Sequence, residues 1–268
     1  MCTSLTPDLT IIDAFANATI AVNSAGTSLY VTIGDQARRW EISGGDDCGL
    51  APDPSFTPTL DGEVEDLAVT AAGEVYATID SQTYSPIQIW PAADAKQCLL
   101  GPDEPLGGHS IAVGGDGTGL FVGYTDADYH TQLYRAAPDL EGCTLQLQWT
   151  ESGQHQAGFN NFVLDADGRM HVLAHDDDSN DVMVILDTSG ATVKTYKGSK
   201  NSLCTASTVT RCGADICVMS CSNMYRFSDD GDLLQDIDLT ETFGFSGDHI
   251  GIAGATDGTV YVLRVGGP

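Results

Sequence analysis

The segment FVLDADGRMHVLA, residues 162–174, combines an apolar triplet, a turn rich in aspartate and glycine, and an alternating apolar run. Related segments begin at Ile20, Leu67, Ile111, Thr208 and Ile250, so the pattern occurs six times at spacings of 42 to 51 residues. Each copy predicts two short β-strands joined by a tight turn. Asp-Gly, as at Asp167-Gly168, supplies the positive φ angles that a two-residue hairpin loop needs.

Two further strands follow in most copies. The third is marked by a bulky residue, as in RRWEI (38–42) and IQIWP (87–91), and the fourth is more polar, as in ATVKTYK (191–197). Four antiparallel strands in about every 40–50 residues are typical of a propeller blade. The sequence therefore predicts an all-β, six-bladed β-propeller that forms a single domain over residues 1–268, with blades starting near residues 20, 67, 111, 162, 208 and 250.

The last copy is shorter than the others, because few residues follow its second strand. A strand-like segment, LTIIDAF (residues 9–15), precedes the first copy. Propellers leave few sheet edges exposed when their blades close into a ring. We therefore expect residues 9–15 to complete the last blade, as its third strand, and to close the ring; the alternative is that the chain is part of a longer protein.

Two of the copies, FVLDADGRMHVLA and IAGATDGTVYVLRV (252–265), resemble NHL-type repeats and the related lactonase-like six-bladed propellers. The resemblance extends over the whole chain as a blade pattern and implies the fold. Lactonase-like propellers hold a divalent cation near the axis with carboxylate and asparagine side chains. By resemblance, the analogous positions here are Glu65 or Asp66, Asn160 or Asn161, and Asp248.

The strand order assigns each loop to one of two ends of the propeller. Loops from the second to the third strand, and from the outermost strand to the next blade, share what is here called the top end. The hairpin turns between first and second strands lie at the bottom end. This places Asp165 and Asp167 at the bottom end, and His171 lies within a strand, where we expect it to pack.

Polar side chains concentrate at the predicted top end. The candidate metal ligands are Glu65, Asp66, Asn161 and Asp248; the candidate ligand-binding groups are Asn160, His130 and His175; and the candidate acid/base residues are His109 and His249. Such groups suit a divalent cation, calcium or zinc, or a polar small molecule. The alternative is a water-filled channel in which polar groups satisfy the strand ends.

The charge balance limits the class of partner. The chain has 11 basic and 38 acidic residues, a net charge of −27. Such a surface repels nucleic acid and anionic lipid, and it suits cations or cationic partners, or serves solubility alone. No stretch is long and apolar enough for a transmembrane helix. We expect a monomer that binds a small molecule or a protein at the top end.

The eight cysteines favour disulfides and an oxidising compartment, either extracellular, periplasmic or at the cell surface. The spacing predicts a Cys212–Cys217 bond across a hairpin and a Cys204–Cys221 bond at its top end; a four-cysteine zinc site is the alternative. Cys2 is either a lipid anchor or a disulfide partner. The pairing of Cys48, Cys98 and Cys143 stays open.

Two functional hypotheses follow. The first is a secreted or surface-attached propeller that binds a ligand, metal or protein at the top end of its channel. The second is a metal-dependent hydrolase or lyase, with the cation at the channel mouth and His109 or His249 as acid/base. The sequence contains neither a GxSxG nor an HExxH motif.

Overall fold

In the computed structural model the described residues are 18–23, 25–34, 36–42, 49–56, 58, 62–70, 73–79, 87–90, 95–96, 110–114, 119–125, 131–135, 145–150, 162–175, 181–197, 203, 206–220, 222–243 and 248–265. Their strands form five four-stranded sheets and one two-stranded sheet, all antiparallel. The segment 9–15, which was expected to close the ring, lies outside the described residues.

The strands follow one another from the inside of each sheet to its outside. The first two sheets contain β1 (Ala18–Val22), β2 (Ser28–Ile33), β3 (Gln36–Ile42) and β4 (Leu50–Pro52), then β5 (Val64–Val69), β6 (Val75–Ile79), β7 (Ile87–Trp90) and β8 (Ala95–Lys96). The next two contain β9 (Ile111–Val113), β10 (Leu120–Thr125), β11 (Thr131–Arg135) and β12 (Gln146–Thr150), then β13 (Phe162–Leu164), β14 (Met170–His175), β15 (Asp181–Leu186) and β16 (Thr192–Tyr196). The last two contain β17 (Ala206–Cys212), β18 (Asp215–Ser220), β19 (Asn223–Phe227) and β20 (Leu233–Asp238), then, after the short helix α1 (Leu239–Phe243), β21 (Asp248–Gly254) and β22 (Val260–Val265).

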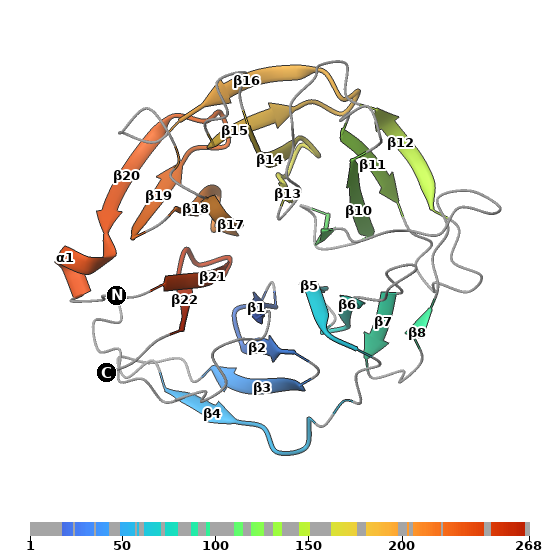
Figure 1. Ribbon diagram of the computed structural model, residues 1–268, viewed down its shortest axis with the longest axis vertical. Helices are drawn as coiled ribbons and strands as arrows, with labels where there is room; N and C mark the ends of the chain where they lie inside the picture. The colour runs from blue at the N-terminus through green and yellow to red at the C-terminus, as the bar shows by residue number, and fades with distance from the viewer. Residues whose placement is uncertain are drawn as a thin grey trace.

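The sheets stand around a common axis with their first strands innermost (Figure 1). Each innermost strand contacts the next in the order β1, β5, β9, β13, β17, β21, and β21 also contacts β1. This arrangement is a β-propeller, as the sequence predicts.

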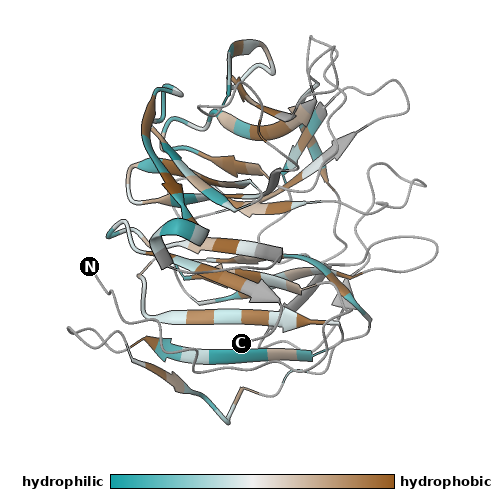
Figure 2. Ribbon diagram, turned by 60° about the vertical axis from the view of Figure 1, so that its left-hand side comes forward, coloured by the Kyte–Doolittle hydropathy of each residue, from teal (hydrophilic) through white to brown (hydrophobic). Residues whose placement is uncertain are grey.

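Burial falls from the inner strands to the outer ones. Every side chain of β6 is buried, whereas β20 is mostly exposed. Hydrophobic and hydrophilic residues alternate along many strands (Figure 2), so that apolar side chains fill the space between neighbouring sheets. Phe162 and Met170, for example, pack with Leu133 of the preceding sheet in one core cluster.

The hairpin turn at Asp167-Gly168 is one residue longer than the sequence suggests. Asp165 N donates to Arg169 O at 3.0 Å, and Gly168 N donates to Asp165 O at 3.1 Å, so the loop holds three residues. Gly168 closes it with φ +77°, which glycine adopts without a steric penalty. Asp165 Oδ1 accepts hydrogen bonds from Asp167 N and Arg169 N, both at 2.9 Å, which stabilises the longer turn.

A glycine in an outer turn packs on an aromatic ring of the preceding sheet. A Cβ atom on Gly231, in the β19–β20 turn, would lie 2.8 Å from the Tyr196 ring of β16. A Cβ atom on Gly190, in the β15–β16 turn, would lie 2.7 Å from the Trp149 ring of β12. Both glycines have positive φ, 74° and 80° respectively. These turns therefore lock neighbouring sheets together at the rim.

Cys212 and Cys217 form a disulfide with their Cα atoms 6.0 Å apart. Cys217 pairs with Thr210, and Cys212 pairs with Asp215, so the bond runs diagonally across the β17–β18 hairpin and not between directly opposite residues. Both sulfur-bearing side chains are fully buried. The other six cysteines, Cys204 and Cys221 included, lie outside the described residues.

The search for membrane-spanning helices covers the described part of the chain. None of its helices has the length and the hydropathy that such a span requires.

Candidate functional site

The innermost strands surround a central cavity of about 340 Å³. Residues of β1, β5, β9, β13, β17 and β21 all line it, and most of these are aliphatic or glycine. Asp66 and Arg211 are the charged residues among the described residues that line the cavity. The channel is therefore a mainly apolar space with few polar groups, the usual character of a small-molecule site.

Asp66 lies on β5 toward the top end and joins two sheets. Its Oδ2 accepts hydrogen bonds from Ser110 Oγ and, at 2.8 Å, from Ile111 N of β9, while Oδ1 accepts one from Leu67 N at 2.8 Å. The side chain is buried, and burial raises the pKa of Asp66 to about 6 although these hydrogen bonds favour the carboxylate. The carboxyl group thus holds the innermost strands β5 and β9 together.

Threonines on β17 bind the next innermost strand in the same way. Thr208 Oγ1 accepts a hydrogen bond from Ile252 N at 3.2 Å, and Thr210 Oγ1 accepts one from Gly254 N at 3.0 Å. Thr208 directly precedes the buried Val209, as Asp66 directly precedes the buried Leu67. One of the predicted metal ligands, Asp66, and two threonines that the sequence did not single out therefore satisfy backbone N–H groups of neighbouring innermost strands.

The remaining predicted site residues fall into two groups. Glu65 is exposed on β5, and the structure describes the strand positions of His175, at the end of β14, and of Asp248 and His249, at the start of β21. His109, His130, Asn160 and Asn161 lie outside the described residues. Among the side chains that the structure does describe, no three His, Cys, Asp or Glu groups are placed to hold a metal ion. The metal and acid/base assignments stay predictions.

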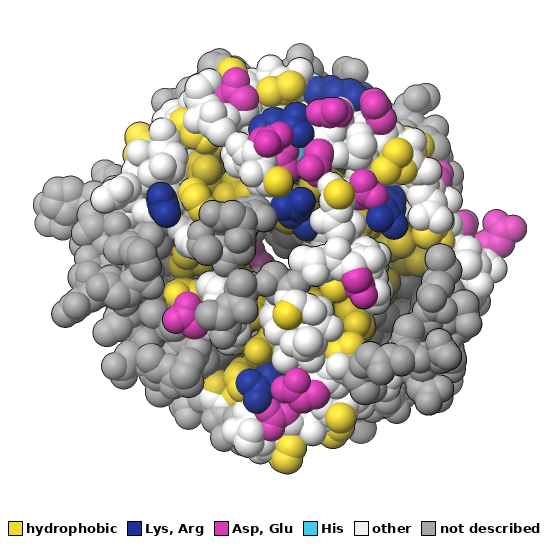
Figure 3. All heavy atoms as spheres, turned by 180° about the vertical axis from the view of Figure 1, so that it is seen from behind, with side chains coloured by type: hydrophobic (Ala, Val, Ile, Leu, Met, Phe, Trp, Pro, Cys, Tyr) yellow, Lys and Arg dark blue, Asp and Glu magenta, His cyan; other side chains and the backbone are white. Residues whose placement is uncertain are grey.

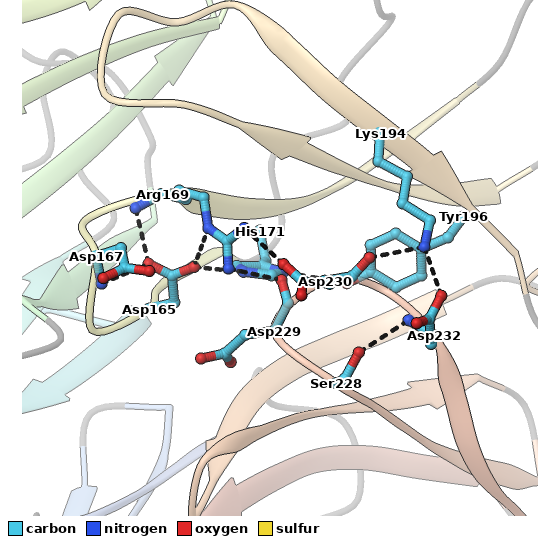
Figure 4. Close-up of polar contacts among 10 residues, drawn as sticks. All are labelled: Asp165, Asp167, Arg169, His171, Lys194, Tyr196, Ser228, Asp229, Asp230 and Asp232. Atoms are coloured by element: carbon cyan, nitrogen blue, oxygen red, sulfur yellow. Dashed lines mark hydrogen bonds and ion pairs between the residues drawn. The ribbon is translucent and has the colours of Figure 1, made fainter.

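The bottom end contains a buried network whose residues the sequence predicts only as packing and as part of a turn (Figure 4). His171 of β14 is fully buried, with Nε2 3.2 Å from Asp165 Oδ2 and Nδ1 3.3 Å from the Tyr196 hydroxyl. Burial lowers the pKa of His171, although Asp165 acts in the opposite direction. The neutral imidazole fits this geometry, because it donates to the carboxylate and accepts from the phenol.

Asp165 is equally buried, and Arg169 Nε donates to its Oδ2 at 2.6 Å. Burial alone would favour the neutral acid, but the hydrogen bonds from Arg169 keep the pKa of Asp165 below its usual value. A histidine and an arginine on an otherwise apolar hairpin, close to an aspartate, were the sequence signal for this network.

The same network links two sheets. Arg169 Nη1 donates to Asp230 Oδ1 at 2.9 Å, and Nη2 donates to Asp229 O at 3.0 Å. Lys194 Nζ donates to Asp230 O at 2.7 Å and to Asp232 Oδ1 at 2.8 Å. The β19–β20 turn is therefore held by two cationic side chains of the preceding sheet.

The face opposite to that of Figure 1 shows how these groups are distributed. Acidic and basic side chains lie next to each other on it, and hydrophobic side chains lie between them and beside the central hollow (Figure 3).

No protein-family model and no curated protein matches the sequence. Solved structures do match over nearly the whole chain. Hydrazine synthase of Kuenenia stuttgartiensis matches with a TM-score of 0.60 at 12% identity, over 97% of this chain and 76% of that one. A putative gluconolactonase matches with a TM-score of 0.56 at 16% identity, over 94% of this chain and 87% of the other.

The β-propeller domain of Cps50 (Swd1) from Myceliophteria thermophila also matches, with a TM-score of 0.56 at 12% identity, over 96% of this chain and 95% of that domain. One of these neighbours is thus described as a lactonase, whereas another is a propeller domain named without an activity. At these identities the likeness shows the β-propeller fold and nothing of the chemistry.

Proposed function

We propose that the protein is a ligand-binding β-propeller that takes a small molecule into its central channel. The observation that carries the proposal is the cavity of about 340 Å³ that all the innermost strands line. Its size is at the lower end of the range of small-molecule sites, about 300–1,000 Å³, and its mainly apolar lining is typical of them. The top-end groups Asn160, His130 and His175 would contact the ligand where it enters.

Equilibrium binding of the uncharged fluorescent probe N-phenyl-1-naphthylamine tests this proposal. Val113 lines the cavity and is only half-buried, so Val113→Trp fills space in the channel. Leu147, 52% exposed on the outer strand β12, gives the matched control Leu147→Trp. Saturable one-to-one binding to the wild type and to the control, but not to Val113→Trp, is the expected result. Equal binding to all three proteins, or no binding to the wild type, refutes the channel as the site.

We also propose that the propeller closes into a complete ring. The β21–β22 sheet has two described strands where the others have four, and β21 contacts β1. We propose that this sheet is the sixth blade and that residues 9–15 add an outer strand to it. Disulfide trapping tests this: cysteines placed at Ile12 and Leu263 should crosslink within one chain, whereas a pair at Ile12 and Leu147 should not.

A second candidate function is a metal-dependent hydrolase or lyase with a calcium or zinc ion at the top end. The observation that favours it is Asp66, a buried carboxyl group that lines the channel toward the top end, with His109 or His249 as the acid/base group. Glu65, Asp66, Asn161 and Asp248 would be the ligands. Metal analysis of the purified protein should then find stoichiometric calcium or zinc that is lost in Asp248→Ala and kept in Asp257→Ala. A metal content unaffected by Asp248→Ala excludes this site.

The cysteines support the location that we propose. The Cys212–Cys217 disulfide and the even number of eight cysteines support a secreted or surface-attached protein in an oxidising compartment. We propose that it is a monomer, with Cys2 as a candidate lipid anchor. Fractionation of the native source, with mass spectrometry of the peptide that contains Cys2, should find the protein outside the cytoplasm and an acylated Cys2. An unmodified Cys2 removes the anchor from the proposal.

A further inference from the structure

Arg211 is an exception in a ring of equivalent positions at the bottom end of the channel. On each innermost strand, one residue pairs with an apolar residue at the start of the second strand and also lines the cavity. These six residues are Val22, Val69, Val113, Leu164, Arg211 and Gly254. Valine or leucine fills the position in four sheets and glycine in one. A charged side chain there departs from the repeat, and such departures concentrate at functional sites.

The strand geometry sets the direction of Arg211. Thr210 binds Gly254 N in the β21–β22 sheet, and successive side chains of a strand alternate, so Arg211 points toward the β13–β16 sheet. There it lies close enough to act on the charges of Asp229 and His171. The Oδ1 atom of Asp229 is buried and accepts no hydrogen bond. Arg211 and Asp229 are thus neighbours.

We propose that the ligand of the channel is a small amphiphile with one carboxylate, which Arg211 binds, and with a hydrocarbon part that contacts the aliphatic residues of the ring. The inference rests on the proposed function. Arg211 is the one basic residue among the described residues that line the cavity, and a guanidinium matches a carboxylate with two parallel hydrogen bonds. The oxygens of Asp66, the other charged lining residue, already accept hydrogen bonds from the protein.

The overall charge of the protein opposes an anionic ligand. With a net charge of −27, the protein repels anions at long range, so an anionic ligand requires a local cation. Asp229 opposes the bound anion. Loss of its charge in Asp229→Asn should therefore strengthen binding of a carboxylate, whereas loss of the Arg211 charge should weaken it.

Displacement of N-phenyl-1-naphthylamine from the full chain by octanoate, octan-1-ol and octylamine tests the inference. Octanoate should bind the wild type about tenfold or more tightly than octan-1-ol, and octylamine should bind no better than the alcohol. Arg211→Gln should remove this preference without changing the affinity for octan-1-ol, and Asp229→Asn should increase it. Arg135→Gln, at the end of β11 and outside the cavity lining, should keep it.

A third variant covers the case in which Arg211→Gln does not fold. Arg211→Lys keeps the charge but loses the planar fork, and it should show a reduced preference for octanoate. Equal binding of octanoate and octan-1-ol to the wild type overturns the inference but leaves the channel as a ligand site. A preference for octanoate over octan-1-ol that survives in Arg211→Gln also overturns the inference and leaves the channel as a ligand site. Equal binding of the probe to wild type and Val113→Trp instead overturns the proposed function itself.

Discussion

Gly231 offers a sharp test of how the sheets are held together at the rim. Its φ of +74° makes alanine unfavourable by about 1–2 kcal/mol, as at any left-handed position. A Cβ atom there would also lie 2.8 Å from Cδ1 and 3.1 Å from Cε1 of Tyr196. Tyr196 is buried, and Phe227 packs against it with ring centroids 4.6 Å apart, so the ring has little room to move.

Gly73 provides the matched control. It has a φ of +83°, and a Cβ atom on it would meet nothing within 4 Å. Gly73→Ala should therefore cost only the backbone term, about 1–2 kcal/mol. Gly231→Ala adds the cost of overpacking, about 1–3 kcal/mol, so its free energy of unfolding should fall by about 2–5 kcal/mol in total.

Urea unfolding followed by tryptophan fluorescence and by circular dichroism gives both values. In a Tyr196→Leu background, which removes the aromatic ring, Gly231→Ala should cost no more than Gly73→Ala. Equal costs of the two alanine substitutions in the wild-type background would refute the packing of the β19–β20 turn on Tyr196.

Three further outcomes follow from the same structure. The pKa of Asp66 is about 6 in the folded protein, against 3.8 in the unfolded chain. Its stabilising effect is therefore complete below pH 3.8 and is lost as the pH rises through 6, and it amounts to roughly 3 kcal/mol. Asp66→Asn should remove that part of the pH dependence of the free energy of unfolding. Burial lowers the folded pKa of His171 below 6.5, so its stabilising effect is present above pH 6.5 and is lost as the pH falls toward the folded value. In urea unfolding, the free energy of unfolding of His171→Gln should therefore depend less on pH on the acid side than that of the wild type. An unchanged dependence would contradict the buried neutral imidazole. Replacement of both Cys212 and Cys217 with alanine opens a loop of sequence separation 5. In calorimetry at pH 7 the free energy of unfolding should fall by about 2 kcal/mol. A fall of less than about 0.5 kcal/mol would contradict the chain-entropy model of disulfide stabilisation.

Much of the fold is visible in the sequence because each hairpin is local. The predicted strand pair around Asp167-Gly168 is β13 and β14, and the bulky residues Trp40, Trp90 and Tyr134 lie on the third strands β3, β7 and β11. Alternation of apolar residues and the position of glycine are short-range properties, so a single copy suffices to recognise them.

The links between sheets are not local, and the sequence could not predict them. Asp66 binds the backbone of Ile111, 45 residues later, and Arg169 binds Asp230, 61 residues later. Such contacts depend on how two sheets are placed against each other, which no hairpin pattern specifies. For that reason Asp66 reads as a metal-ligand candidate in the sequence but lies in the structure as a link between innermost strands.

The same limit applies to the candidate site. The sequence does not single out Arg211, which differs from the other residues of its ring only when the six innermost strands are compared in register. It does not predict the proximity of Asp229 to Arg211 either, because that depends on where the β19–β20 turn lies. The top-end candidates His109, His130, Asn160 and Asn161 lie outside the described residues, and their roles stay predictions.

The central claim, a ligand in the channel between the innermost strands, has a direct structural test. Crystals soaked with 1-bromonaphthalene and measured at the bromine absorption edge locate the bound molecule through its anomalous scattering. We predict one strong bromine peak inside the channel, in contact with Val22 and Val113, that disappears in Val113→Trp. A peak outside the channel, or none in crystals of the wild type, would contradict it.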